Sequence, residues 1–208
     1  MIPVKVLASR VIANAAAGLR MGLGAPVGYP SLGLLTTDCD DATYIALDAA
    51  TKAADVRVCY ARSFYAGAGN ATTPNAGEVI GVLAGANPET LKSGMEAAIS
   101  TLQRVGFEEV NGVPFLAHTV SSVGTFLAEE AGVRVGTAIS YLIAPPLEAM
   151  YGLDGALKAA DVKLCKLYSP PSETNFGGGL LSGTQSACDA ACRAFAERVR
   201  EVAERAMV

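Results

Sequence analysis

Residues 47–59, LDAATKAADVRVC, and residues 153–165, LDGALKAADVKLC, are two copies of one stretch of sequence. Both keep an Asp near the start, a Lys-Ala-Ala-Asp-Val run in the middle and a Cys at the end. A repeat of this kind indicates two similar modules in one chain. We therefore predict a first domain over residues 1–107 and a second over residues 108–208, joined near residues 107–112.

The likeness continues more weakly on both sides of that stretch. The matching pieces are Leu7-Ala8 with Leu116-Ala117, Val11 with Val120, and Leu83-Ala84-Gly85 with Leu181-Ser182-Gly183. Each copy then predicts the same order of elements, which is two strands, a helix, two strands and a helix. This order extends the repeat over nearly the whole chain.

The expected elements follow from apolar spacing and from capping residues. Strands are expected at 4–14, 32–36, 56–60, 78–83, 113–123, 138–144, 162–167 and 180–181. Helices are expected at 40–54, 88–105, 146–160 and 184–207, the first opening on capping Asp residues and the third on a proline. Stretches 66–77 and 169–179 are predicted to be loops because they are rich in Gly, Asn, Thr, Ser and Pro.

Strands and helices mixed in this way, in modules of this size, predict an α+β fold. Each module is expected to be a sandwich of the ferredoxin-like kind, with helices on one side of a mostly antiparallel sheet. The other sheet face and the sheet edges would then be open to a partner, which suits lateral assembly.

Composition narrows the function classes. Of the 208 residues, 51% are hydrophobic and 17% are charged, which predicts a folded chain rather than a disordered one. The formal net charge is -4 and no Lys/Arg cluster is present, so we expect no nucleic-acid partner. Apolar stretches are too short to cross a bilayer and no signal peptide is evident, so we expect no membrane association and a cytoplasmic location.

The residues offer no catalytic constellation. The single histidine, His118, lies in a strand-like run and is interpreted as structural, because no nucleophile elbow accompanies it. The five cysteines lack a paired C-x-x-C spacing, which favours reduced, mostly buried thiols over disulfides or a zinc site. Cys188 and Cys192 are four apart on a predicted helix, where packing is favoured over metal binding. We therefore expect no enzyme activity, no cofactor and no metal.

An acidic cluster is the one polar feature with a chemical interpretation. Asp38, Asp40 and Asp41 lie where a helix is expected to begin, and helix capping explains one carboxylate but not all three. A spare carboxylate there could hold a small cation, with Glu78 as its companion. Capping alone remains the alternative.

The repeated Asp…Lys-Ala-Ala-Asp-Val motif resembles the helix-to-strand signature of bacterial microcompartment shell proteins. The wider chain is similar to their tandem-domain EutL family, over nearly its whole length. The matching runs are SLGL (31–34), DCDD (38–41), TY (43–44), ARS (61–63), YAGA (65–68), AGEV (76–79), APPLEA (144–149) and PPSETN (170–175).

This resemblance implies a structural, non-enzymatic shell protein built of tandem, circularly permuted domains. Three chains would form a pseudohexameric disc that tiles into the shell with other shell proteins. It implies a central pore closed by loops at 63–73 and 171–179, with the gate residues Tyr65, Gly67, Gly69, Asn70, Asn175, Phe176 and Gly177. It also implies shell-edge lysines at Lys52 and Lys158.

The family further implies ethanolamine binding in a small side pore of each subunit. Carried over by motif, Asp41, Glu78 and the backbone carbonyl of Phe107 would hold the ammonium group. Carboxylates balance such a cation and a carbonyl accepts its N–H donors.

A different class of function stays open from the residues alone. The chain could be a metabolite-sensing, trimeric α+β regulatory protein, which would form discrete trimers at all concentrations. A shell tile would instead form two-dimensional sheets when concentrated.

Overall fold

The computed structural model describes residues 1–63, 77–170 and 175–207 of the chain. Its backbone contacts divide it into two compact units. The first-repeat unit comprises Pro3–Gly106 together with Gly124–Leu127. The second-repeat unit comprises Met1–Ile2, Phe107–Val123 and Ala128–Val208.

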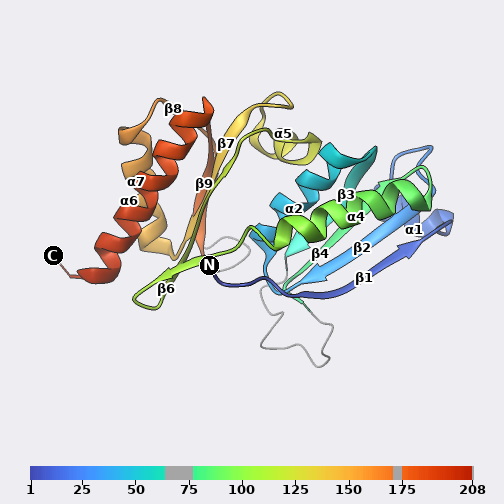
Figure 1. Ribbon diagram of the computed structural model, residues 1–208, viewed down its shortest axis with the longest axis horizontal. Coiled ribbons are helices and arrows are strands. Elements are labelled where there is room, and N and C mark those ends of the chain that lie inside the picture. The colour runs from blue at the N-terminus through green and yellow to red at the C-terminus, as the bar shows by residue number, and fades with distance from the viewer. Residues whose placement is uncertain (64–76, 171–174, 208) are drawn as a thin grey trace. The chain divides into compact units, whose positions relative to one another are not determined.

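The first-repeat unit is an antiparallel sheet with helices packed on it. Its strands, in the sheet order β1-β2-β4-β3, are β1 (Val6–Ile12), β2 (Ser31–Thr37), β4 (Val79–Gly85) and β3 (Val56–Ser63). Helices α2 (Asp40–Ala53) and α4 (Pro88–Leu102) lie over one face of this sheet, and the short α1 (Ala17–Gly22) follows β1 (Figure 1). Every strand pair in it is antiparallel.

The second-repeat unit has the same plan with one additional edge strand. Its sheet order is β5-β6-β7-β9-β8, formed by β5 (Glu108–Val110), β6 (Val113–Val120), β7 (Ala138–Ala144), β9 (Gly177–Gly183) and β8 (Val162–Tyr168). Helices α6 (Pro146–Ala159) and α7 (Gln185–Glu204) pack on this sheet, and α5 (Thr125–Ala131) follows β6. The equivalent order β6-β7-β9-β8 confirms the predicted α+β repeat.

The duplication extends to an irregularity in the third strand of each copy. The pairing register shifts between Val58 and Tyr60 in β3, and between Leu164 and Lys166 in β8. The residue at each shift is a motif cysteine, Cys59 or Cys165. A bulge at the same place in both copies bends both edge strands alike.

Helices α6 and α7 of the second-repeat unit pack closely at a glycine. In the second-repeat unit, a Cβ atom built on Gly152 of α6 would lie 2.7 Å from the Phe195 ring of α7. Phe195 is fully buried, and it belongs to a core cluster with Leu142, Leu153 and Leu181. Glycine at this position therefore permits the approach of α7 to α6.

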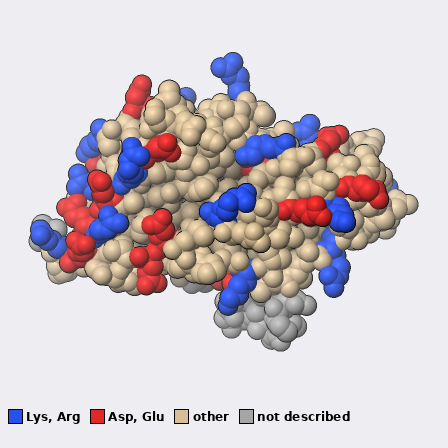
Figure 2. All heavy atoms as spheres, viewed as in Figure 1, with Lys and Arg blue, Asp and Glu red and all other residues tan. Residues whose placement is uncertain are grey.

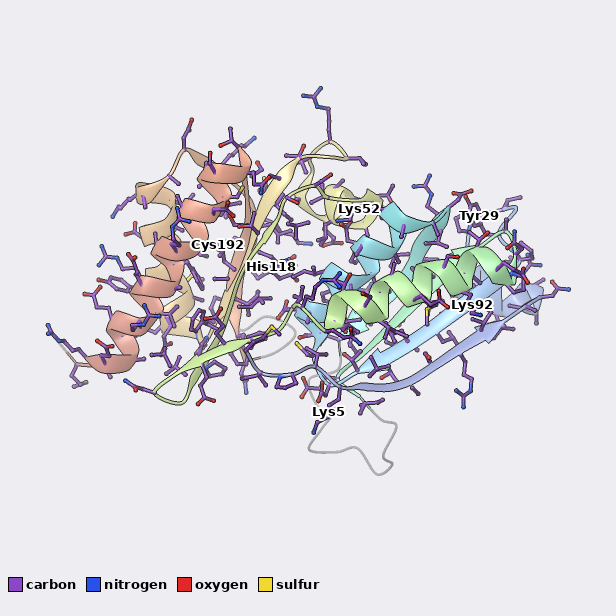
Figure 3. The ribbon with its side chains drawn as sticks, in the orientation of Figure 1. Lys5, Tyr29, Lys52, Lys92, His118 and Cys192 are labelled. Carbon is purple, nitrogen blue, oxygen red and sulfur yellow. The ribbon has the colours of Figure 1, made fainter. Side chains whose placement is uncertain are left out.

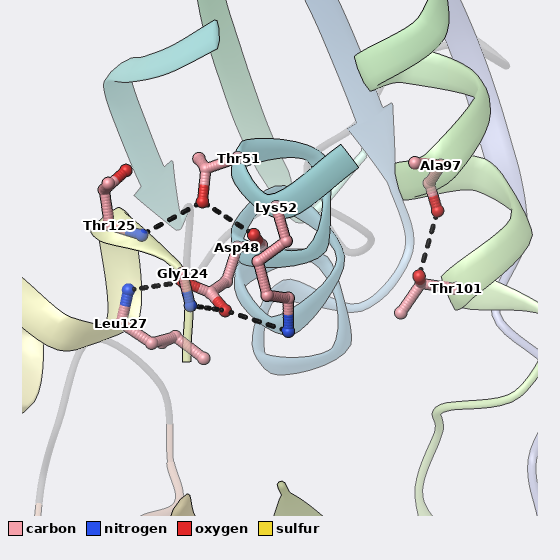
Figure 4. Close-up of polar contacts among 8 residues, drawn as sticks. All are labelled: Asp48, Thr51, Lys52, Ala97, Thr101, Gly124, Thr125 and Leu127. Atoms are coloured by element: carbon pink, nitrogen blue, oxygen red, sulfur yellow. Dashed lines mark hydrogen bonds and ion pairs between the residues drawn. The ribbon is translucent and has the colours of Figure 1, made fainter. Parts of the chain in front are cut away.

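A buried carboxylate holds the segment Gly124–Leu127 against α2 within the first-repeat unit. Asp48 of α2 is fully buried, and it accepts hydrogen bonds from the Gly124 N–H at 2.7 Å and the Leu127 N–H at 2.9 Å (Figure 4). The Thr51 hydroxyl accepts a bond from the Thr125 N–H at 3.0 Å. These bonds satisfy backbone donors at the start of α5, which otherwise have no partner within the helix.

Several element predictions are corrected by the structure. Gly177 to Gly179 were expected in a loop, but they begin β9, which is as long as β4 because β7 and β8 both pair with it. The Asp residues were expected to cap α2; its N-cap is Cys39, which makes no side-chain cap bond, but Asp40 Oδ1 accepts the first-turn Asp41 N–H. The elements α1, α5 and β5 were not predicted, because each is short.

Candidate functional site

Three carboxylates of the first repeat, Asp38, Asp40 and Asp41, lie where β2 passes into α2. Asp40 and Asp41 form the first turn of α2 and are each 9% exposed. The Asp41 N–H donates to Asp40 Oδ1 at 2.8 Å, and the Lys5 N–H donates to Asp38 Oδ1 at 2.8 Å. Negative side chains are favoured in a first helical turn because the exposed N–H groups there carry partial positive charge.

Strands β3 and β4 bring two more polar groups to the same place. The Ser63 hydroxyl, at the end of β3, donates to Asp40 Oδ2 at 2.6 Å. The Glu78 N–H, just before β4, donates to the Thr37 carbonyl oxygen at 2.8 Å. Glycine precedes Glu78 because a Cβ on Gly77 would lie 2.2 Å from that same carbonyl oxygen. We call Asp38, Asp40, Asp41 and Glu78, with Ser63, the acidic site.

The negative charges of the acidic site favour a bound cation. Burial raises the pKa of the Glu78 carboxyl, and the negative charges of Asp40 and then Asp38 raise it further. Burial likewise raises the pKa of the Cys39 thiol well above its usual range, with the neighbouring carboxylates adding to the effect. A bound cation would relieve this repulsion and favour the ionised form of Glu78.

The chemistry of the acidic site fits an organic ammonium group better than a metal ion. Carboxylate oxygens accept N–H donors of an ammonium, and a neighbouring hydroxyl can hydrogen-bond a polar ligand tail. Among residues 1–63, 77–170 and 175–207, no group of three or more His, Cys, Asp or Glu side chains is placed to hold a metal ion.

In the described part of the second repeat, the positions equivalent to the acidic site carry other residues. The repeat offset places Pro146 and Leu147 where the first copy has Asp40 and Asp41. Phe176, just before β9, takes the place of Glu78, just before β4. These replacements are apolar, so the described part of the second repeat does not repeat this carboxylate cluster.

The predicted ligand residues belong to different units. Asp41 and Glu78 lie in the first-repeat unit, whereas Phe107 belongs to the second-repeat unit. The Phe107 carbonyl accepts the Ile2 N–H at 2.6 Å, and its ring lies 5.7 Å from that of Phe176. The contribution of Phe107 to ligand binding stays a prediction.

The predicted gate residues divide into two groups. Tyr65, Gly67, Gly69 and Asn70 lie outside the described residues. Asn175 and Phe176 precede β9, whereas Gly177 is the first residue of β9 and pairs with Ala144. Gly177 is thus part of a sheet rather than of a loop.

The two motif lysines lie on equivalent helices with different partners. Lys52 Nζ is 3.4 Å from the buried Asp48 carboxylate, and Lys158 Nζ is 2.7 Å from the exposed Asp154 carboxylate. The Lys52 side chain is 37% exposed and the Lys158 side chain is 74% exposed. Both side chains are at least partly exposed, and a role at a shell edge stays a prediction.

The histidine and the cysteines lie in ordinary structural positions. His118 is in β6 opposite Tyr141, and Cys192 lies on α7 (Figure 3). All the cysteines are free thiols; Cys188 and Cys192 are buried, whereas Cys39, Cys59 and Cys165 are partly buried, so burial is less complete than predicted. Burial raises the pKa of the Cys59, Cys188 and Cys192 thiols, which lowers their reactivity.

The face of the molecule in view has no large patch of one charge sign. Lys and Arg side chains alternate there with Asp and Glu side chains (Figure 2). No helix in the described part of the chain is long and apolar enough to cross a bilayer.

Sequence reasoning did not place Asp40 and Ser63 together. Asp40 was treated only as a member of the DCDD cluster, and Ser63 only as the start of a loop. The hydrogen bond between them joins residues that are 23 positions apart, so no local sequence pattern predicts it.

Comparison with known proteins identifies close relatives over nearly the whole chain. The BMC domain family matches residues 31–114. The bacterial microcompartment shell protein EutL of Clostridium perfringens is 54% identical over 95% of this chain and 93% of its own length. EutL of Escherichia coli is 48% identical over 95% and 92%. A crystal structure of ethanolamine utilization protein EutL from Leptotrichia buccalis superposes with a TM-score of 0.96, at 52% identity, covering 100% of this chain and 97% of that one.

Proposed function

Because the chain belongs to the EutL family of bacterial microcompartment shell proteins, we propose that it forms a pseudohexameric trimer with a gated central pore and binds ethanolamine at the acidic site. Its role in the shell itself is structural, as the family is named for that role.

The observation that supports the pseudohexamer is the repeated strand order. Each chain holds two units of the plan β1-β2-β4-β3 and β6-β7-β9-β8. Three chains in a closed ring therefore supply six similar wedges, which is the arrangement that tiles a flat layer. Light scattering coupled to chromatography is expected to give the mass of three chains, and electron microscopy of concentrated protein is expected to show two-dimensional sheets. A monomer would overturn the ring, and discrete trimers at every concentration would favour a regulatory protein over a tile.

The acidic site supports the choice of ligand. Ethanolamine combines an ammonium group with a hydroxyl, which suits clustered carboxylates beside the Ser63 hydroxyl. A relative of 52% identity is named for ethanolamine utilization. The Asp41 and Glu78 carboxylates would balance the ammonium charge, and the Phe107 carbonyl would accept one of its N–H donors.

Isothermal titration calorimetry tests this assignment. Glu78→Gln and Asp41→Asn are each expected to raise the Kd for ethanolamine by at least about tenfold, since a hydrogen bond to a charged partner is worth about 1.5–3 kcal/mol. The control Glu96→Gln removes an exposed carboxylate of α4 and is expected to leave the Kd unchanged. Ethylene glycol, which lacks the ammonium group, is expected not to bind. An unchanged Kd in both site variants would refute the assignment.

The pore and the edge contacts are the remaining parts of the proposal. Tyr65, Gly67, Gly69 and Asn70, with Asn175 and Phe176, are proposed to gate the pore, because glycine-rich segments change conformation at low steric cost. Lys52 and Lys158 are proposed to meet neighbouring discs. Lys158→Ala is expected to abolish sheets in micrographs while light scattering still gives trimers.

A further inference from the structure

One helix face is covered in the first repeat and open in the second. In the first-repeat unit the outer face of α2 is covered by Gly124–Leu127. Asp48 and Thr51 hold that segment by hydrogen bonds, and the Tyr44 and Phe126 rings lie 6.1 Å apart. The equivalent face of α6 carries exposed apolar side chains that nothing in the described chain covers. They are Leu147 (62% exposed), Met150 (36%) and Leu157 (37%).

The Asp at the centre of this face shows the same contrast. The Asp48 side chain is 0% exposed, whereas the Asp154 side chain is 56% exposed. Both are paired with a lysine four residues later on the same helix. In α2 that pairing coexists with the bonds from Gly124 and Leu127, because a carboxylate has about four acceptor positions. The pair between Asp154 and Lys158 therefore leaves acceptor capacity for a second partner.

The first repeat contains a second copy of the covering segment. The Gly24 N–H donates to the Met21 carbonyl at 3.2 Å, and the Gly132 N–H donates to the Glu129 carbonyl at 3.2 Å. The Ala25 N–H donates to Arg20 at 2.9 Å as the Val133 N–H donates to Ala128 at 3.0 Å. These matching turns align α1 with α5. Residues 16–19 (AAGL) thus correspond to Gly124–Leu127 (GTFL).

This second segment is exposed, although its sequence is apolar. Leu127 is 1% exposed, but its counterpart Leu19 is 46% exposed. Ala16, Ala17 and Gly18 are also exposed, and no side chain caps α1 at Ala16. Residues 16–19 and the apolar face of α6 are both uncovered, whereas their counterparts in the repeat, Gly124–Leu127 and α2, contact each other. This equivalence indicates a contact between chains.

We propose that α6 of one chain receives residues 16–19 of a second copy of this chain, in the place that Gly124–Leu127 take on α2 within one chain. The Ala16 and Leu19 N–H groups then donate to the Asp154 carboxylate, and Leu19 packs beside Leu157. This contact is head-to-tail, since the two surfaces differ. It rests on the proposed ring of three chains, and it gives the residues that would close that ring.

The contact within one chain and the proposed contact between chains differ in their first residue, which is Gly124 in the former and Ala16 in the latter. A Cβ on Gly124 would lie 2.2 Å from Thr51 Oγ1 and 2.7 Å from the Asp48 carbonyl oxygen. Ala16 has such a Cβ, so residues 16–19 sit further from α6 than Gly124–Leu127 sit from α2. Leu157, which replaces the smaller Thr51, fills the wider gap with apolar contact.

Single charge insertions on either surface test the proposal. Leu19→Glu and Leu157→Glu are each expected to lower the trimer fraction in light scattering at least tenfold and to yield folded monomers. Val27→Glu is the matched control, because Val27 and its counterpart Val135 are both well exposed, at 103% and 62%. It is expected to remain trimeric.

Mixing the two variants identifies the partners. The Leu19→Glu chain keeps an intact α6 face, and the Leu157→Glu chain keeps an intact residue 19. An equimolar mixture is therefore expected to give hetero-dimers in native mass spectrometry at the concentration that gives wild-type trimers, although neither variant associates alone. Absence of hetero-dimers would overturn the pairing. Wild-type trimers with both variants also trimeric would overturn this contact and leave the ring standing, whereas a monomeric wild type would overturn the ring.

Discussion

The two motif aspartates occupy the same place in the repeat and opposite environments. Asp48 is fully buried beneath Gly124–Leu127, whereas Asp154 is more than half exposed on α6. Both helices keep the Asp and Lys four residues apart, which is enough to set a local pair on one helix face. The burial of Asp48 depends instead on a segment 76 residues away in the sequence. A repeated motif thus specifies a helix and its local ion pair but not what covers them.

The same divergence separates the two copies at the start of their central helices. The first copy presents Asp40, Asp41 and Glu78, and the second presents Pro146, Leu147 and Phe176. The two copies therefore share a fold, but carboxylates in the first copy stand where the second has apolar side chains.

Replacing the two aspartates is expected to give the largest difference between the copies. Asp48→Ala leaves the Gly124 and Leu127 N–H groups buried without an acceptor, so it is expected to lower the free energy of unfolding by about 3–5 kcal/mol. Asp154→Ala is expected to change it by about 0.5 kcal/mol or less, because an exposed pair contributes little.

Urea denaturation of both variants, made in the Leu19→Glu background so that association does not contribute, measures this difference. Equal losses for the two variants would contradict the contrast between the copies.

Two glycines of α6 are expected to give the next largest effect. Gly152 and Gly155 stand where α2 has Ala46 and Ala49. Gly152→Ala would place a methyl group 2.7 Å from the buried Phe195 ring, so it is expected to cost about 1–2 kcal/mol despite better helix propensity.

Gly155→Ala is the matched control, three residues along the same helix. Its Cβ would meet only the Arg198 side chain, at 2.6 Å from Cγ, and that exposed chain can move away. It is expected to be neutral or stabilising by up to about 1 kcal/mol. A similar loss in both variants, measured by thermal unfolding, would show that α6 and α7 do not pack through Gly152 alone.

The smallest expected effect is the pH dependence introduced by Glu78. Its pKa is raised in the folded protein, so folding favours the protonated carboxyl, and the stability this adds is lost as pH rises from about 4.5 through the raised pKa. Glu78→Gln removes that loss.

The difference in unfolding free energy between Glu78→Gln and the wild type is therefore expected to grow with pH across this window and then level off. Ethanolamine is expected to reduce the difference, because the cation favours ionised Glu78. A pH-independent difference would show that Glu78 is not in a negative environment.

Much of the fold was predictable because its determinants are local. The strand at 138–144 is confirmed residue for residue, and α6 begins at Pro146 as a proline in the first turn predicts. The shell-protein family was also predictable, since both copies of the motif are intact.

Two of the differences between prediction and structure have a non-local cause. Gly177 to Gly179 have low strand propensity, but β7 and β8 provide hydrogen-bond partners on both sides. The start of α5 lacks a local capping residue because Asp48 supplies its acceptor from another part of the chain.

The acidic site divides in the same way. The DCDD run and Glu78 were recognisable as a cation-binding candidate from charge alone. The hydrogen bond from Ser63 to Asp40, and the raised pKa of Glu78, depend on distances that only folding creates.

The sequence alone determines the order of the elements, the duplication, the family and the two Asp–Lys pairs, because helix periodicity and short-range spacing specify them. The tertiary structure decided which Asp is buried, which glycines are strand and which carboxylates meet at the acidic site. Those outcomes depend on groups that are far apart in the chain, and burial changes the free energy of a charge only after they have come together.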